Sequence, residues 1–261
     1  MPAVALSIGG SDPSGGAGIQ ADLKVFHQFG VYGEAVISLL TVQNTRAVSR
    51  VHFVDAALLR EQIEAVVADI PPAAAKTGAL GNREAVEAVA EMAGSWEFPL
   101  IVDPVMISKH GARLLSEDAQ ASFKRKLLPR AFLLTPNIPE AESLTGMTIR
   151  NEDGMHRAAQ QLRNDGCRAV LLKGGHLIGE PVDIYSGPEA PIARFPGQRV
   201  RTRNTHGTGC TYSAAITAAL ALGMSTLDAI AQSKRFVQSA IETAPELGAG
   251  CGPLNHWSKD N

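Results

Sequence analysis

The sequence predicts an α/β fold in which helices cover both faces of one mostly parallel central sheet. Three observations favour it. Short runs of β-branched and aliphatic residues alternate along the chain with stretches of helical periodicity. Glycine-rich loops separate these runs, because 25 of the 261 residues are glycine. No internal repeat or Pro/Ser-rich linker interrupts the alternation, and we therefore expect a single domain over residues 1–261.

The first half of the chain shows the alternation most plainly. Asp55 and Asn82 are typical N-cap residues, and each comes directly before a run with helical spacing. Gly30 is typical of a residue that ends a helix. The expected strands here are residues 3–8, 34–42, 73–77 and 99–103, and the expected helices are residues 19–29, residues 55–69 and a helix that begins at Asn82.

In the second half, the alternation of strands and helices stops after an expected strand at residues 169–173. Three short runs with Gly and Pro turns follow at residues 182–185, 192–195 and 198–202, and they predict a small antiparallel patch. The other expected elements are a strand at residues 132–135 and helices at residues 155–165, 211–222 and 227–243.

Composition argues against several classes of protein. Lys plus Arg number 24 and Asp plus Glu number 26, so the net charge is 24 − 26 = −2, which does not suit nucleic-acid binding through bulk charge. No apolar run approaches the ~18 residues of a membrane span, and the first residues do not resemble a secretion signal. Cys167, Cys210 and Cys251 form no CxxC pair, so a reducing cytoplasm is expected.

Polar side chains follow several expected strands at the point where each strand ends. In an open parallel sheet, ligands bind beyond the carboxyl ends of the strands. We therefore expect these side chains to share one site. They are Ser11, Asp12, Gln43, Asn44, Asp103, Asn137 and Lys173.

A glycine-rich turn, residues 204–210 (NTHGTGC), comes directly before an expected helix. Glycines let the backbone approach a ligand closely, and a helix N-terminus supplies N–H groups and partial positive charge. Gly207, Thr208 and Gly209 therefore suit a phosphate in transfer. We expect the first helical turn to lower the pKa of Cys210 toward neutrality, so that its thiolate can accept a proton. The alternative interpretation is a tight turn that leads into a buried helix, with Cys210 as a small core residue. In either case we expect His206 to shape the turn rather than to bind a metal.

A second glycine-rich loop, residues 10–18, lies between the first strand and the first helix. It suits the placement of backbone and Asp22 over a small substrate. Its segment Gly16-x-Gly18-x-x-Ala21 also fits a relaxed dinucleotide-binding pattern, with Glu34 as the ribose carboxylate, so an oxidoreductase remains an alternative. The P-loop pattern G-x-x-x-x-G-K-[ST] does not occur.

Two further motifs suit a metal ion and a nucleotide. Asn137 and Glu140, three residues apart at a helix start, can place two oxygens near hydrated Mg²⁺, and Asp103 can add a third. Helix capping is the alternative interpretation of the Asn/Glu pair. Lys173 is followed by two glycines and His176, and it suits binding of a nucleotide phosphate. The alternative interpretation is a surface lysine in a turn.

Taken together, these motifs resemble one family of enzymes. They are residues 10–24 (GSDPSGGAGIQADLK), 42–45 (VQNT), 76–80 (KTGAL), 103–106 (DPVM), 135–141 (TPNIPEA), 173–176 (KGGH) and 204–215 (NTHGTGCTYSAA). The chain resembles the ribokinase-like superfamily of small-molecule kinases and, within it, the hydroxymethylpyrimidine/phosphomethylpyrimidine kinases of thiamine biosynthesis. The resemblance runs from the first expected strand to the final third of the chain.

The resemblance implies a ribokinase-like three-layer α/β/α fold and ATP-dependent phosphorylation of 4-amino-5-hydroxymethyl-2-methylpyrimidine, then of its monophosphate. It also implies Mg²⁺ and a cytoplasmic homodimer with neither nucleic acid nor membrane as a partner. The implied catalytic groups are Cys210 as base and Gly207, Thr208 and Gly209 as anion hole. The implied binding residues are Gln43, Ala17, Asp22, Ala79 and Val105 for the substrate, Lys173, Asn137 and Thr208 for the nucleotide, and Glu140 and Asp103 for the metal.

One position departs from the family pattern. Many members have Met where this chain has Ala79, and alanine leaves more room beside the substrate ring. A bulkier vitamin ring would fit there, so a pyridoxine or pyridoxal kinase of the same superfamily is the near alternative. Lys109 and His110 are candidates for binding the phosphate of the monophosphate substrate. A non-catalytic ligand-binding protein on the same fold is the third alternative.

Overall fold

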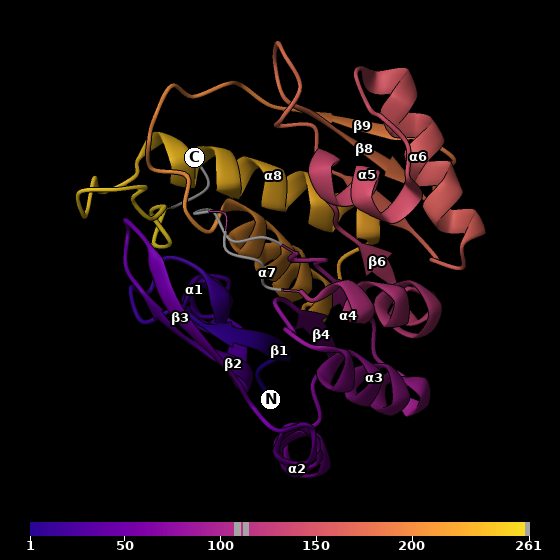
Figure 1. Cartoon of the computed structure of the whole chain (residues 1–261). Coiled ribbons are helices and arrows are strands. Elements are labelled where there is room, and N and C mark those ends of the chain that lie inside the picture. Colours follow the sequence, from indigo (N-terminus) through magenta and orange to yellow (C-terminus); the bar gives the residue numbers. More distant parts are fainter. Residues whose placement is uncertain (107–110, 112–114, 259–261) are drawn as a thin grey trace.

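One nine-stranded sheet forms the centre of the computed structural model, which describes residues 1–106, 111 and 115–258 (Figure 1). The strands are β1 (Val4–Ser11), β2 (Tyr32–Gln43), β3 (Val48–Phe53), β4 (Ala74–Thr77), β5 (Leu100–Val102), β6 (Leu133–Leu134), β7 (Val170–Leu172), β8 (Val182–Ser186) and β9 (Ala193–Pro196). The α-helices are α1 (Gly18–Gln28), α2 (Ala56–Asp69), α3 (Arg83–Met92), α4 (Glu117–Ser122), α5 (Ile138–Thr145), α6 (Glu152–Asn164), α7 (Thr208–Ala221) and α8 (Thr226–Glu242).

The sheet order is β3-β2-β1-β4-β5-β6-β7-β8-β9. The strands from β2 to β7 pair in parallel, so their carboxyl ends lie along the same edge of the sheet. At one end β3 pairs antiparallel with β2, and at the other β8 and β9 continue the sheet in antiparallel pairing. The expected mostly parallel sheet with a small antiparallel patch is therefore confirmed.

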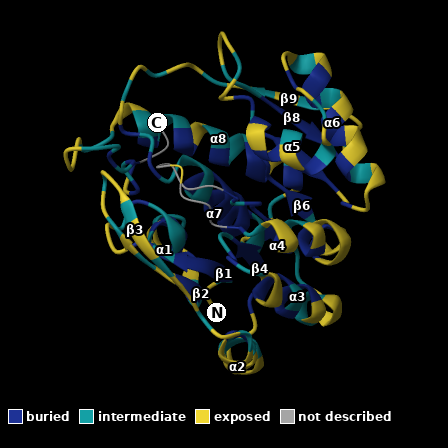
Figure 2. Ribbon diagram, in the orientation of Figure 1, coloured by how far each residue is buried: buried dark blue, intermediate teal, exposed yellow. Residues whose placement is uncertain are grey.

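Helices cover both faces of the sheet. Side chains of α2, α3, α5 and α6 pack in one core with Leu6 and Ile8 of β1. Side chains of α1, α7 and α8 pack in a second core with Ala5 of the same strand, as the alternation of a strand requires. Figure 2 shows α7 as buried, and its residues 211–219 are buried without a break. Small side chains suit this position, because they let α7 approach the sheet and its neighbouring helices closely.

Two local expectations need correction, and two short elements were not expected. Residues 198–202 form no strand, because the backbone N–H groups of Gln198 and Arg199 bond to the side chains of Gln238 and Glu180 instead of to a neighbouring strand. Helix α7 begins at Thr208, three residues earlier than expected, which keeps Cys210 in the first turn. The short elements β3 and α4 were not expected at all.

The described helices include none that combines the length and the apolar character needed to cross a membrane. The expected helix starts at Asp55 and Asn82 are confirmed, since the side chain of each accepts a hydrogen bond from the first turn of its helix.

Candidate active site

A cavity of about 1100 Å³ opens at the carboxyl edge of the parallel strands. Its walls come from the loop after β1, the ends of β2, β4 and β5, the loops after β6 and β7, and the start of α7. The cavity is lined by all of the catalytic, binding and metal residues that the family resemblance implies: Ala17, Asp22, Gln43, Ala79, Asp103, Val105, Asn137, Glu140, Lys173, Gly207, Thr208, Gly209 and Cys210. Asn44, which was also expected to share the site, does not line it, because its side chain bonds to the N–H groups of Arg46 and Ala47 in its own turn. Lys109 and His110 lie outside the described residues.

The start of α7 forms one wall of the cavity. Gly207 caps the helix with a φ of 80°, and a Cβ on it would lie 1.8 Å from the carbonyl oxygen of Gly16, so only glycine fits there. The Thr208 hydroxyl donates to the carbonyl of Thr205 at 2.8 Å, which fixes the turn. The N–H groups of the first turn have no carbonyl partner within the helix, and they give this wall its preference for anions.

The Cys210 thiol is half-buried in this wall. Its pKa is raised to about 11, first by burial. Lys76 and a hydrogen bond from the Gly18 backbone oppose this shift, and the Asp22 and Asp103 carboxylates add to it. The expectation of a lowered pKa was therefore wrong, because it considered the helix N-terminus alone. The side chain nevertheless lines an open cavity and is not enclosed in the core.

A buried ion pair supports the floor of the site. Lys76 Nζ donates to Asp22 Oδ1 at 2.8 Å, and Ser7 Oγ donates to Asp22 Oδ2 at 2.6 Å. The lysine and aspartate side chains are 0% and 2% exposed. Burial alone would lower the pKa of Lys76, but Asp22, Cys210 and Asp103 raise it above its usual value. The lysine is therefore a fixed positive charge near the thiol.

Lys76 was not among the expected site residues. Its signs in the sequence are its place inside a short apolar strand, where a charged side chain needs a partner, and its position at the start of the 76–80 motif. Asp22 was expected at the substrate, and it does line the cavity, but both of its carboxylate oxygens are already bonded to protein groups.

A second ion pair lies beside the helix start. Lys173 Nζ donates to Asp103 Oδ1 at 3.0 Å, and the Thr135 hydroxyl donates to the same oxygen at 3.2 Å. A Cβ on Gly209 would lie 3.3 Å from Lys173 Nζ and 3.6 Å from Asp103 Oδ2. The ammonium, the carboxylate and the first turn of α7 therefore meet at one point, as expected for the phosphate end of a site.

Asn137 and Glu140 form a capping box at the start of α5. The Asn137 side chain accepts from the Glu140 N–H at 2.9 Å, and the Glu140 carboxylate accepts from the Asn137 N–H at 2.8 Å. The capping interpretation is thus observed, yet both residues also line the cavity. Burial raises the pKa of Glu140 to about 7; Lys173 opposes this shift and Asp103 adds to it.

These carboxylates suit a magnesium ion. No group of three His, Cys, Asp or Glu side chains arranged for a metal occurs in the part of the chain that the structure describes. Mg²⁺ in kinases needs only one or two carboxylates, because substrate phosphates and water complete its shell. The pKa of Glu140 is raised first by its burial, and Asp103 adds to the shift, so a divalent cation between the two carboxylates would stabilise the ionised form of Glu140.

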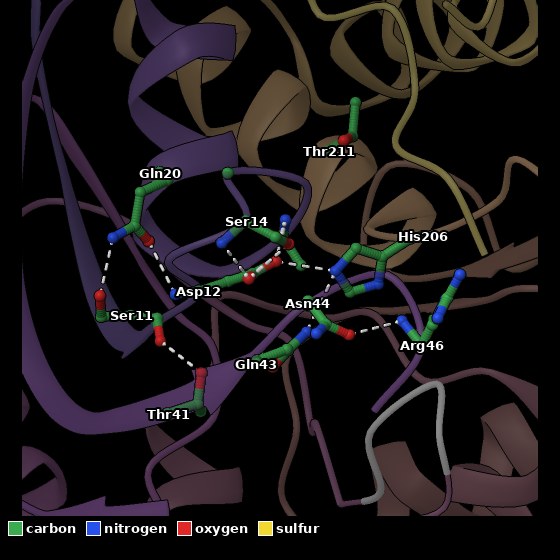
Figure 3. A network of polar contacts seen from close by, with 12 residues as sticks. Ser11, Asp12, Ser14, Gln20, Thr41, Gln43, Asn44, Arg46, His206 and Thr211 are labelled. Carbon is green, nitrogen blue, oxygen red and sulfur yellow. Dashed lines mark hydrogen bonds and ion pairs between the residues drawn. The ribbon is translucent and has the colours of Figure 1, made fainter. Parts of the chain in front are cut away.

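Another part of the cavity wall is formed by Gln43, Ala17, Ala79 and Val105. Figure 3 shows the polar network there, in which Asp12 bonds to the loop after β1 and to His206, and His206 lies beside Gln43. Glu34, by contrast, does not line the cavity and pairs with Leu6 near the opposite end of β1, so it does not serve as a ribose ligand there.

Comparison with known proteins decides the family. Residues 12–255 match the family described as phosphomethylpyrimidine kinase. This chain belongs to that family. A hydroxymethylpyrimidine/phosphomethylpyrimidine kinase of Rhizobium meliloti is 44% identical over 267 residues, with 100% of both chains covered. A thiamine biosynthesis bifunctional protein of Geobacter sulfurreducens is 48% identical over 96% of this chain, which spans 51% of that longer protein.

Solved structures of kinases share the fold. The phosphomethylpyrimidine kinase of Clostridium difficile is 43% identical, with a TM-score of 0.82 over 92% of this chain and 99% of that one. The pyridoxal kinase of Staphylococcus aureus, solved with AMP-PCP and pyridoxal, is 31% identical, with a TM-score of 0.90 over 99% of this chain and 94% of that one. The expected ribokinase-like α/β/α fold is therefore confirmed.

Proposed function

We propose that this kinase phosphorylates 4-amino-5-hydroxymethyl-2-methylpyrimidine with ATP, and then phosphorylates the monophosphate, in thiamine biosynthesis. The observation that carries the proposal is the convergence of Cys210, the first turn of α7 and the Lys173–Asp103 pair on one wall of the cavity. Membership of the phosphomethylpyrimidine kinase family supports the same reaction. Residues 1–261 act as one catalytic domain in this proposal.

Proton transfer and charge stabilisation are the two tasks of the site. The substrate hydroxyl loses its proton to Cys210 Sγ as its oxygen forms a bond to the γ-phosphorus of ATP and the bond to the leaving ADP oxygen breaks. The N–H groups of Gly207, Thr208 and Gly209 stabilise the transferring phosphoryl, and Lys173 neutralises charge on the nucleotide phosphates. Lys76 favours the thiolate form of Cys210 electrostatically.

Asp103 and Glu140 would hold the magnesium ion of this reaction, with Asn137 beside them. The ion, when bound, supplies charge neutralisation of the nucleotide phosphates. Glu140 remains a helix cap in this arrangement, because a carboxylate has enough lone pairs to accept the Asn137 N–H and to face the cavity.

The test is ATP consumption measured with hydroxymethylpyrimidine, its monophosphate and pyridoxal side by side. We expect turnover with both pyrimidines and a lower kcat/KM with pyridoxal. A pyridoxal kinase is the second candidate, because Ala79 leaves room in the wall of the cavity and a pyridoxal kinase shares the fold at a TM-score of 0.90. Exclusive turnover of pyridoxal would overturn the pyrimidine assignment, and tight NADH binding without any ATP consumption would favour the oxidoreductase instead.

We also propose a cytoplasmic homodimer. Val42 and Phe53, on the antiparallel pair β2–β3, are exposed at 56% and 43%, and β3 ends the sheet. A second copy that covers this apolar edge would bury them. Light scattering should give twice the chain mass of 27.5 kDa, and Val42→Lys should shift the equilibrium toward monomer, whereas a monomeric unaltered chain would contradict the proposal.

A further inference from the structure

His206 lines the cavity but takes no part in the proposed chemistry. Its ring is buried, with Nε2 2.7 Å from Asp12 Oδ2 and 3.2 Å from Gln43 Nε2 (Figure 3). Its backbone N–H donates to the carbonyl of Gly252 at 3.0 Å. A Cβ on Gly16 would lie 2.6 Å from the ring, so the ring fits tightly against this glycine. The imidazole is therefore fixed in the cavity wall beside Gln43.

The Asp12 carboxylate determines whether Nε2 of the His206 ring carries a hydrogen. It also accepts hydrogen bonds from Ser14 and from the Ala17 N–H. Burial alone would raise the pKa of Asp12, but the bonds from His206 and Ser14 hold it below its usual value, so Asp12 is ionised. An unprotonated Nε2 at 2.7 Å from a carboxylate oxygen would place two lone pairs against each other. Nε2 therefore carries a hydrogen and donates it to Asp12.

The Nε2–H group of His206 restricts the orientation of the Gln43 side-chain amide. Two N–H groups cannot bond to each other, so an amide nitrogen 3.2 Å from the protonated Nε2 gains nothing from this contact. Turning the amide over places Oε1 3.2 Å from Nε2, where it shares the one Nε2 hydrogen with Asp12 in a three-centre bond, and directs the NH₂ group away from the ring. Because Gln43 lines the cavity, its NH₂ group then faces the substrate.

We propose that His206 is a positioning residue that orients the Gln43 amide, so that Gln43 presents a hydrogen-bond donor and selects a heteroaromatic ring nitrogen with a free lone pair. The inference rests on the proposed function, because the aminopyrimidine ring supplies that acceptor. Asp12 acts one step further back, since it holds the Nε2–H form of the ring and the loop of residues 12–17 together.

Steady-state kinetics of four variants tests the inference. His206→Phe fills the space without a donor, whereas His206→Gln places an N–H close to the position of Nε2. We expect His206→Phe to raise the KM for hydroxymethylpyrimidine about tenfold, as for one lost hydrogen bond, with the KM for ATP unchanged. His206→Gln should stay within about threefold of the unaltered chain. In a Gln43→Ala background, His206→Phe should have no further effect, because the amide that it orients is gone.

The control is His256→Phe. His256 is also buried, and its ring bonds to Thr211 Oγ1 at 3.1 Å, away from the cavity lining. Its replacement should affect thermal stability without changing the KM for the pyrimidine. The inference is overturned if His206→Phe raises this KM equally in the Gln43→Ala background, or if His206→Gln behaves like His206→Phe.

A measurement on the unaltered chain covers the case in which His206→Phe does not fold. Nitrogen-15 NMR of labelled histidine should show His206 protonated at Nε2, and an unprotonated Nε2 would overturn the inference. Calorimetric binding of hydroxymethylpyrimidine, without ATP, separates this inference from the proposed function. Binding that depends on His206 through Gln43 without any turnover would refute the kinase assignment alone, whereas absence of binding would refute both.

Discussion

Replacing Cys210 by alanine should lower kcat by about 10²–10⁴-fold, the usual contribution of a general base. The half-buried Cys210 is a cysteine that lines the cavity, and its sulfur lies at the start of α7, where the phosphoryl group is expected. Its removal leaves Lys173 and Asp103 in place, so ATP affinity should change little. Coupled ADP release measures kcat, and fluorescence titration with a nucleotide analogue measures binding.

Cys251→Ala is the matched control. Cys251 is also half-buried, but its sulfur donates to the Arg203 carbonyl at 3.1 Å and it does not line the cavity. This variant should keep kcat within about twofold of the unaltered chain, because surface substitutions away from a site change little. Unaltered turnover in Cys210→Ala would refute the role of Cys210 as base and would leave the anion hole and Lys173 as the main sources of catalysis.

The pH dependence of kcat is an independent test of Cys210 as the general base. Because the pKa of Cys210 is raised to about 11, the thiol form dominates at neutral pH and the thiolate fraction rises about tenfold for each pH unit below that value. If the thiolate accepts the proton, log kcat should rise with a slope near one between about pH 7 and 9. Cys210→Ala should lose this slope. A flat profile in the unaltered chain would mean that another step limits the rate.

Local patterns were sufficient to predict most of the cavity lining. Asp103, Asn137 and Lys173 each follow a strand of one parallel sheet, and topology alone places such residues along the same edge. The glycine turn before α7 was likewise recognisable, because its function depends on residues adjacent in the chain. Strand β3 escaped prediction because its side chains are exposed or half-buried on both faces, so it has no apolar alternation.

Long-range partners explain the remaining errors. The pKa of Cys210 depends on Asp22 and Asp103, which belong to distant segments, and no argument from the helix start alone includes them. Lys76 and Asp22 are 54 residues apart, and His206 and Asp12 are 194 apart. A sequence pattern shows a buried lysine or histidine without showing what it pairs with, and the pairing determines its function.

Lys76→Met should lower the free energy of unfolding by about 3–5 kcal/mol, because it leaves the Asp22 carboxylate buried without its counter-charge. Both side chains are almost fully buried, so water compensates little for the lost ammonium. Urea denaturation monitored by circular dichroism measures the change. The control is Arg60→Met, which breaks the exposed pair with Glu91 and should cost less than about 1 kcal/mol. Equal losses in the two variants would contradict the account of a buried charge pair.

A double variant separates the structural role of Lys76 from its electrostatic role. Lys76→Met with Asp22→Leu removes both charges, and replacement of a buried ion pair by apolar side chains is often neutral for stability. We expect stability near that of the unaltered chain. Activity at pH 7 should nevertheless differ, because the pKa of Cys210 loses the lowering effect of Lys76 and the opposing effect of Asp22 together. Lys76 has the larger of these two effects, so the thiolate fraction and kcat should both fall. Unchanged kcat in a fully stable double variant would show that the ion pair serves the fold alone.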